Sequence, residues 1–251
     1  MLNLKIPVFD MKFTVLASGS KANGYLLHNQ SEALVIEAGV SLLKVKKALD
    51  FRLHLIKGCI VTHRHRDHAR YIRQYADAGI SIFGPENIFE VPHHRNRPIW
   101  PFKGYLTGNF QIIPFEVAHD VPCFGYLIDH PDAGRILFLT DTYLCEYSFP
   151  YLSHIIIEAN YCDDILEDNI LKGIEHLSKR ERLLTSHMEL ETTKAVLMAQ
   201  DLSGVKNIIL THLSDRNSDE ARFIDEIKAL TGKSVSAAKA GITLRLTKKT
   251  F

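Results

Sequence analysis

The sequence predicts one α+β domain built from two β-sheets that helices cover. The first observation is the order of elements, because strand patterns fill the N-terminal part and strands mix with helices afterwards. The second is size, since 251 residues with 46% hydrophobic content can bury a large core. The third is that the sequence shows neither an internal repeat nor a low-complexity linker, so we expect residues 1–251 to form a single domain.

The N-terminal part reads as a series of short strands. Residues 18–24 are turn formers and predict a hairpin turn; a glycine- and serine-rich loop can also cradle phosphate, but this one lacks the lysine spacing of a Walker loop. Ser41 can cap a helix with apolar residues on one face. The expected strands are residues 12–17, 25–28, 34–37, 55–61 and 80–83.

The segment 93–101 contains basic residues, two prolines and the only tryptophan, Trp100. It has no periodicity, so we expect no regular element there. Two interpretations stay open: a lid that faces the substrate, or a solvated loop that a buried Trp100 holds in place.

The C-terminal part combines strands with amphipathic helices. Apolar runs predict the strands, and apolar residues at helical spacing predict the helices. Strands are expected at 109–117, 123–128, 135–139, 153–157, 207–210, around Val235 and at 242–246, and helices at 163–177, 189–200 and 219–230.

The segment from Thr62 to His68, THRHRDH, carries the strongest chemical signal. It follows the apolar run 55–61 and precedes residues with helical spacing, so it occupies a strand-to-helix turn. His63 and His65, two apart, can point the same way if the backbone is extended. Asp67 and His68 can then turn toward a second point. Imidazole and carboxylate are good zinc or manganese ligands, and the arrangement indicates two adjacent metal ions.

Further ligand types follow other predicted strands: His119, Asp141, Glu158 and His212. Strand ends are where folds of this class build their sites. We expect one metal to be held by His63, His65 and His119, the other by Asp67, His68 and His212, with Asp141 bridging. Two ions about 3.5–4 Å apart can share a hydroxide that serves as the nucleophile.

Charge and cysteine content limit the function classes. The formal net charge is +1 and the pI about 7.8, which excludes a global basic field for coating nucleic acid. The four cysteines form no CxxC motif, so free thiols and a reducing compartment are expected. Residues 1–13 do not resemble a signal peptide and no apolar stretch approaches about 20 residues, so we expect a cytoplasmic protein without membrane contact.

The string HRHRDH, followed in order by His119, Asp141 and His212, resembles the metallo-β-lactamase superfamily. Residues 16–20 (LASGS), 24–26 (GYL), 37–39 (EAG), 158–160 (EAN) and 211–214 (THLS) resemble the YycJ/WalJ-like branch. The resemblance covers about residues 13–223. It implies an αββα sandwich of two mixed β-sheets flanked by helices, and a hydrolase with two zinc or manganese ions, iron being a third candidate. The branch is associated with nuclease activity on DNA ends, and relatives of this architecture often form homodimers.

The sequence is also similar to the tRNase Z group, in which a glutamate and a later histidine cooperate in proton transfer. Glu158 and His187 stand in the matching order, so the predicted catalytic residues are Asp67, Glu158 and His187; His187 as a surface histidine is the alternative. Glu37 departs from the aspartate that usually supports the metal loop from behind, which changes the reach of that carboxylate. Ser186-His187-Met188-Glu189 also departs from the branch pattern, which leaves the substrate open.

The leading hypothesis is hydrolysis of a nucleic-acid phosphodiester, at DNA or RNA ends. Arg64, Arg66, Arg70 and Arg73 could contact phosphate, or could be solvated or ion-paired. Local basic clusters at 93–97 and 179–182 fit a protein that contacts only a short stretch of nucleic acid. A cyclic-nucleotide phosphodiesterase fits the small net charge of the chain equally well. Two more classes stay open: a lactonase or thioesterase, and a non-catalytic metal-binding module.

Overall fold

The computed structural model describes residues 10–248, which form two seven-stranded sheets. The expectation about a signal peptide at residues 1–13 falls largely outside these residues. Within 10–248, no helix combines the length and apolar character needed to cross a membrane. All four cysteines are buried free thiols, as predicted.

The first sheet has the strand order β14-β1-β2-β3-β4-β5-β6. Strands β1, β2 and β3 pair antiparallel, so residues 18–24 form the predicted hairpin connection, whereas β3, β4, β5 and β6 pair parallel. The strands are β1 (Lys12–Ala17), β2 (Gly24–His28), β3 (Ala33–Ile36), β4 (Ile56–Ile60), β5 (Ile82–Gly84), β6 (Asn96–Pro98) and β14 (Thr243–Arg245).

The second sheet has the order β13-β12-β11-β10-β9-β8-β7. The pairs from β7 to β10 are antiparallel and those from β10 to β13 are parallel. Both sheets are therefore mixed, as predicted. The strands are β7 (Tyr105–Thr107), β8 (Phe110–Val117), β9 (Cys123–His130), β10 (Gly134–Leu139), β11 (Leu152–Glu158), β12 (Asn207–Thr211) and β13 (Ser234–Ala237).

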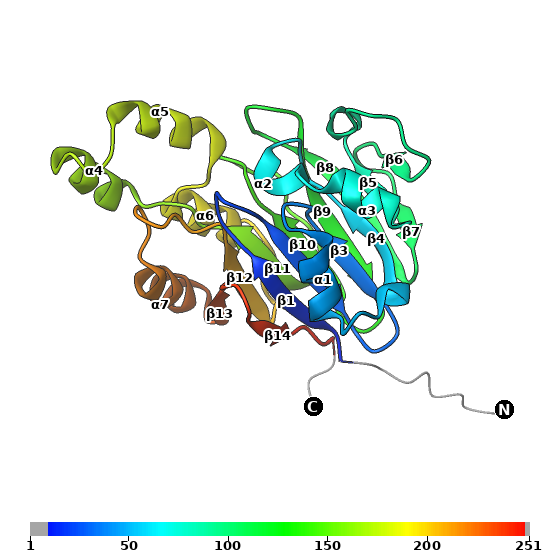
Figure 1. The fold of residues 1–251 in the computed structure, drawn as a ribbon. Helices are drawn as coiled ribbons and strands as arrows, with labels where there is room; N and C mark the ends of the chain where they lie inside the picture. Colours follow the sequence, from blue (N-terminus) through cyan, green and yellow to red (C-terminus); the bar gives the residue numbers. More distant parts are fainter. Residues whose placement is uncertain (1–9, 249–251) are drawn as a thin grey trace.

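Helices cover the outer face of each sheet (Figure 1). The helices are α1 (Leu42–Ala48), α2 (Arg66–Ala69), α3 (Ile72–Asp77), α4 (Asp163–Leu171), α5 (Leu177–Ser186), α6 (Leu190–Met198) and α7 (Glu220–Thr231), with the short 3-10 turns η1 (Leu53–Leu55) and η2 (Glu86–Ile88). Val45 and Tyr75 from α1 and α3 pack on the first sheet, and Leu197 and Phe223 from α6 and α7 pack on the second.

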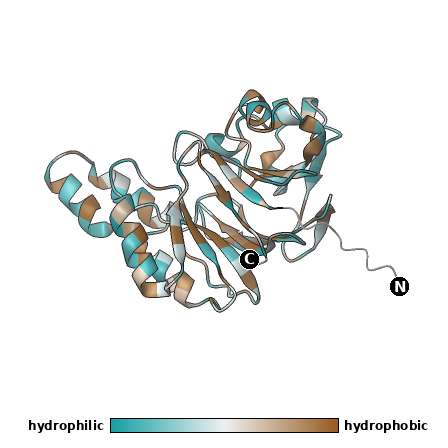
Figure 2. Ribbon diagram, turned by 90° about the horizontal axis from the view of Figure 1, so that it is seen from below, coloured by the Kyte–Doolittle hydropathy of each residue, from teal (hydrophilic) through white to brown (hydrophobic). Residues whose placement is uncertain are grey.

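The central core lies between the two sheets, where Phe13 and Tyr25 of the first meet Tyr126 and Phe138 of the second. Hydrophobic residues run along the strands of both sheets, whereas the helices carry both kinds of residue (Figure 2). The order helix, sheet, sheet, helix is the αββα sandwich that the sequence predicts. Helices α4 and α5 project from one side of this body (Figure 1).

Two predicted helices are interrupted in the structure. The helix after the histidine motif breaks at Tyr71, whose amide donates to Ala38 O (2.9 Å), while the carbonyl of Asp67 accepts from Asn23 N (2.7 Å). These tertiary hydrogen bonds thus use backbone amide and carbonyl groups that would bond to each other within a continuous helix. The helix predicted over 163–177 ends at Leu171 because Gly173 has φ 69°, a left-handed conformation typical of helix ends.

The prediction of no regular element in 93–101 is wrong, because Asn96–Pro98 forms strand β6. This strand lies at the sheet edge, where one side of the backbone is unpaired and proline is tolerated. The interpretation that a buried Trp100 holds this segment is also wrong. The Trp100 side chain is 52% exposed, and Lys103 Nζ lies 5.8 Å from its ring centroid. The hairpin strand β7 was not predicted from the sequence.

We predict that His154 makes the fold sensitive to acid. Burial on β11 lowers the pKa of this imidazole to about 4, whereas an unfolded chain protonates it near 6.5. Between pH 6.5 and 4 the unfolded state therefore binds more protons, and the free energy of unfolding falls by up to about 3 kcal/mol from this group. Urea unfolding at pH 7.5 and 4.5 should show a smaller loss in His154→Gln than in the wild type. Equal losses in both would contradict the prediction.

Candidate metal centre

The predicted ligands meet at one edge of the sandwich because several strands end there. Strands β10, β11 and β12 run parallel, which brings Asp141, Glu158 and His212 to the same edge of the second sheet. His63 follows the end of β4 in the first sheet. The site thus lies where carboxyl ends of strands from both sheets meet.

His63, His65 and His119 form the first group, with ligand-type atoms within 4.8 Å of one another. His65 Nδ1 lies 3.3 Å from His119 Nε2, and the rings of His63 and His119 have centroids 4.7 Å apart. Sequence reasoning missed a fourth participant, Asp120, whose Oδ1 lies 3.1 Å from His119 Nε2 and 3.5 Å from His65 Nε2. Its position next to His119 was the only signal in the sequence.

Asp67, His68, Asp141 and His212 form the second group. Asp141 lies between the two groups: its carboxylate oxygens are 3.3 Å from His68 Nε2, 3.6 Å from His212 Nε2 and 3.9 Å from His63 Nε2. The structure thus brings together all seven predicted ligands in the two predicted groups, with Asp141 at their junction.

The donor set fits divalent metal ions. The Nε2 atoms of His63 and His212 are buried and have no hydrogen-bond partner among the described residues. Each faces the Asp141 carboxylate at a distance too long for a hydrogen bond. Buried polar atoms are normally paired. Two unpaired imidazole nitrogens beside a buried carboxylate therefore indicate a position for a metal ion between them.

The electrostatics of the site favour positive charge. Burial lowers the pKa of His63 well below its usual range, which keeps its nitrogen available as a ligand. Burial also disfavours charge on His212, but Asp141, Asp67 and Glu158 outweigh it and raise the pKa of His212 to about 10. Buried carboxylates therefore draw a cation into the site, and bound metal would take the place of such protons.

Two buried residues, Asn23 and Glu37, position the motif from behind. Asn23 Nδ2 donates to Asp67 Oδ2 (3.1 Å) and lies 2.8 Å from His68 Nε2. Glu37 Oε1 lies 3.3 Å from His68 Nδ1 and accepts a hydrogen bond from Thr62 Oγ1 (2.7 Å). Glu37 thus spans from the end of β4 to the imidazole, the supporting position predicted for it. Asn23, from the hairpin turn, was missed by sequence reasoning because its partners lie more than 40 residues away.

The backbone is strained at three of these positions. Glu37, Asp141 and His212 have φ values of 68°, 50° and 55°, a region that residues with a Cβ seldom adopt. Such conformations cost about 1–3 kcal/mol each and persist where the surroundings hold them in place. Their coincidence with the site is consistent with a function that requires these side chains at fixed points.

Gly39 allows the loop after β3 to pack against the motif, and we predict that Gly39→Ala disrupts the site. An added Cβ would lie 1.7 Å from Asp67 O and 2.6 Å from Asn23 O. Both are backbone atoms, so the start of α2 would have to move. We expect a loss of about 1–3 kcal/mol in unfolding free energy and weaker metal binding. Gly104→Ala is the control, because an added Cβ there would meet only the end of the Gln111 side chain, at 3.2 Å. A wild-type metal content in Gly39→Ala would contradict the prediction.

Glu158 and His187 form a buried pair beside the second group. Glu158 Oε1 lies 2.7 Å from His187 Nδ1, and Glu158 Oε2 accepts a hydrogen bond from Thr142 N (3.1 Å). The Glu158 side chain is fully buried and that of His187 is 12% exposed. The imidazole lines a small cavity of about 60 Å³ together with His65, His119 and His212. His187 is therefore not a surface histidine.

The arginines that the sequence places near the site have three different environments. Arg182, on α5, lines the same small cavity and forms no ion pair with the part of the chain that the structure describes. Arg180 pairs with Glu167 at 3.3 Å. Arg64, Arg66, Arg70 and Arg73 line a different, adjacent cavity.

Comparisons with known proteins agree with this architecture. The exodeoxyribonuclease YycJ of Bacillus anthracis is 22% identical over 92% of this chain and 93% of its own length. The ribonuclease Z of Streptomyces coelicolor is 22% identical over 82% of this chain and 85% of its own. The crystal structure of the metallo-β-lactamase fold protein YhfI from Bacillus subtilis superposes with a TM-score of 0.70 at 19% identity, over 94% of this chain and 99% of that one. No protein-family model matches the chain.

The αββα sandwich and the clustered histidines and aspartates define a metal-dependent hydrolase. The chain has the metallo-β-lactamase fold, and its sequence is similar to those of YycJ and ribonuclease Z. The fold and the similarity to this branch that the sequence predicts are thereby confirmed.

Proposed function

We propose that the protein hydrolyses phosphodiester bonds of nucleic acid, acting at DNA or RNA ends, and that residues 1–251 work as one domain. The observation that carries the proposal is the 2.7 Å contact of Glu158 Oε1 with His187 Nδ1, next to the clustered ligands. The similarity to an exodeoxyribonuclease and to a ribonuclease Z supports the choice of substrate.

Two divalent ions would be held by His63, His65 and His119 on one side and by Asp67, His68 and His212 on the other, with Asp141 between them. Bound there, they would lower the pKa of water toward neutrality and polarise the phosphoryl group. Zinc and manganese both suit these donors, as does iron. The expected cytoplasmic location and homodimer stay predictions, the latter testable by sedimentation.

The chain's own residues supply the proton. A phosphodiester of nucleic acid leaves as an alkoxide, which is a poor leaving group and needs a proton as the bond breaks. His187 can donate that proton from Nε2, because its Nδ1 is held by Glu158. The buried carboxylate also stabilises the charged imidazolium, and it fixes the ring so that Nε2 faces the small cavity.

This acid separates a nuclease from some of the competing functions. A thioesterase expels a thiolate, which is a better leaving group, so a buried Glu158–His187 pair would be of less use to it. A lactonase expels an alkoxide as a nuclease does, and the similarity to two nucleases favours the phosphodiester over the lactone. A non-catalytic metal module has no need of a proton donor. A cyclic nucleotide requires the same acid and is the second candidate.

A substrate panel tests the proposal. The chain, loaded with zinc or manganese, is assayed on end-labelled single-stranded and duplex DNA and RNA, on cyclic nucleotides, on lactones and on bis(p-nitrophenyl) phosphate. We expect the highest kcat/KM on a nucleic-acid strand, with products that shorten from one end. A preference for a lactone would refute phosphodiester hydrolysis. A preference for a cyclic nucleotide would refute nucleic acid as the substrate and assign a cyclic nucleotide instead.

A further inference from the structure

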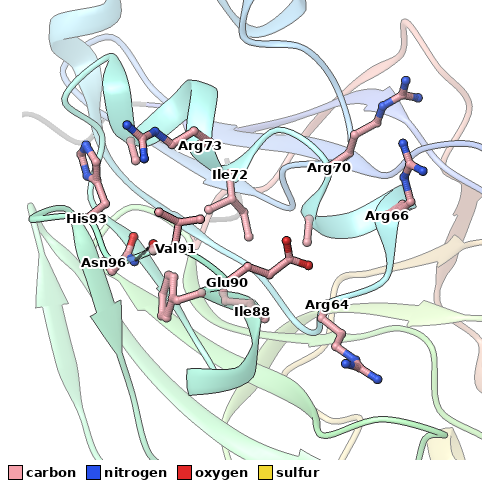
Figure 3. Close-up of a pocket in the computed structure, with 13 residues that line it drawn as sticks. Arg64, Arg66, Arg70, Ile72, Arg73, Ile88, Glu90, Val91, His93 and Asn96 are labelled. Carbon is pink, nitrogen blue, oxygen red and sulfur yellow. Dashed lines mark hydrogen bonds between the residues drawn. The ribbon is translucent and has the colours of Figure 1, made fainter.

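A second, larger cavity lies beside the metal centre, between helices α2 and α3 and the segment 88–96. Its volume is about 480 Å³, within the range of small-ligand sites. Apolar side chains form its middle: Ile72, Ile88 and Val91 lie between the charged groups in Figure 3. Val91 is 58% exposed, so a ligand in the cavity could contact it directly.

Arginines surround this apolar middle. Arg64, Arg66, Arg70 and Arg73 line the cavity, and Figure 3 shows them around its rim. Arg73 pairs with Asp77 at 2.9 Å. Arg64, Arg66 and Arg70 form no ion pair with any residue in 10–248. Arg70 Cζ lies 5.4 Å from the centroid of the Tyr71 ring. With a net charge of only +1 for the whole chain, this concentration of guanidinium groups is local.

One carboxylate opposes them. Glu90 lines the cavity and lies near its centre in Figure 3. The described residues show no ion pair between Glu90 and the arginines. An anion in the cavity would therefore be attracted by the rim and repelled by this single group.

The cavity adjoins the metal centre through the chain itself. Arg64 and Arg66 alternate with His63, His65 and Asp67 along one short segment. The histidines and the aspartate contribute to the metal centre, while the two arginines contribute to the cavity. A polymeric substrate cut at the metal centre would place its next unit within reach of these arginines.

We propose that this cavity binds the unpaired nucleotide that flanks the scissile phosphodiester, an inference that rests on the proposed function. The base would cover Ile72, Ile88 and Val91, since every base has an apolar face that tolerates such contact. The flanking phosphate would contact Arg66 and Arg70, because a guanidinium matches phosphate geometry with two parallel hydrogen bonds. A purely apolar ligand would leave the arginines unused, and a free phosphate would leave the apolar middle uncovered.

Binding of a strand can be measured apart from hydrolysis. Fluorescence anisotropy of a labelled single-stranded 12-nucleotide DNA, with EDTA present, reports affinity for the full chain without turnover. We expect Arg70→Gln to weaken binding about tenfold and to lower the slope of log Kd against log salt by about one. Val91→Asp, on an exposed side chain, should weaken binding at least as much. Glu90→Gln should strengthen it by about threefold, because it removes a repelling charge.

Controls separate this inference from the proposed function. Arg245→Gln, which removes an exposed arginine that pairs with Asp10 elsewhere in the fold, should bind as the wild type does. Hydrolysis of bis(p-nitrophenyl) phosphate by the metal-loaded chain tests the chemistry alone. In Arg70→Gln the ratio of kcat/KM on DNA to that on this small diester should fall about tenfold.

Three outcomes would overturn the inference. The strand does not bind the wild-type chain, or Arg70→Gln and Val91→Asp bind as the wild type does, or Glu90→Gln weakens binding. If the small diester is still hydrolysed in any of these cases, phosphodiester hydrolysis survives and only the role of the cavity is lost. If no diester is hydrolysed while the variants shift strand binding as expected, the cavity binds the strand and the chemistry is wrong.

Discussion

Replacing Asp141 with asparagine is expected to lower kcat on the preferred diester by on the order of a thousandfold or more, because charge stabilisation by metal is worth several kcal/mol. The carboxylate faces three imidazole nitrogens from 3.3 to 3.9 Å, so it is the group that both proposed ions would share. Asparagine keeps its shape but removes the charge. Metal analysis after loading and dialysis should find fewer ions per chain than in the wild type.

The control is Asp168→Asn, at an exposed aspartate of α4 that pairs with Lys172. It should retain metal content and kcat. Circular dichroism should show that Asp141→Asn is folded, since the substitution is isosteric and the histidines around it can lose protons. An Asp141→Asn variant with wild-type activity and metal content would refute the two-metal arrangement.

The metal centre could be predicted from the sequence to the extent that its signals are local. His63, His65, Asp67 and His68 lie in one short segment between a strand and a helix, so their convergence needs no knowledge of the tertiary structure. His119, Asp141 and His212 follow apolar strand patterns, and parallel strands place such residues at a common edge. The two mixed sheets flanked by helices followed from the same strand patterns together with the resemblance.

What the sequence did not reveal depends on long-range contacts. Asn23 reads as a turn residue, and only folding brings its amide to Asp67. The break at Tyr71 follows from a hydrogen bond to Ala38, which no helical periodicity reports. The edge strand β6 is stabilised by pairing with β5 and contains too few residues to show alternation. Trp100 is exposed although tryptophan is usually well buried.

The two sheets contribute different parts of the chemistry. The first sheet presents the histidine motif, held by Glu37 and Asn23, and the adjoining arginine cavity. The second presents Asp141, His212 and the Glu158–His187 pair. The core between the sheets, with Tyr25 against Phe138 at 5.7 Å between ring centroids, therefore holds the histidine motif against Asp141, His212 and the proton donor.

Removing His187 is expected to matter only when the leaving group needs a proton. On a DNA strand, His187→Ala should lower kcat by about 10²–10⁴-fold, the range that general acid catalysis supplies. On bis(p-nitrophenyl) phosphate, whose nitrophenolate is stable without protonation, the loss should be much smaller.

Two further variants decide whether His187 acts through its proton. Glu158→Gln keeps a hydrogen-bonding group beside Nδ1 but removes the charge that stabilises the imidazolium, so it should reproduce most of the loss on DNA while preserving the difference between substrates. His54→Ala, at an exposed histidine on η1, should change neither rate. Equal losses on both substrates in His187→Ala would instead assign the histidine to binding or to support of His212, whose ring stacks on it at 5.1 Å. Because a structural defect lowers both rates together, only the leaving-group dependence identifies the acid.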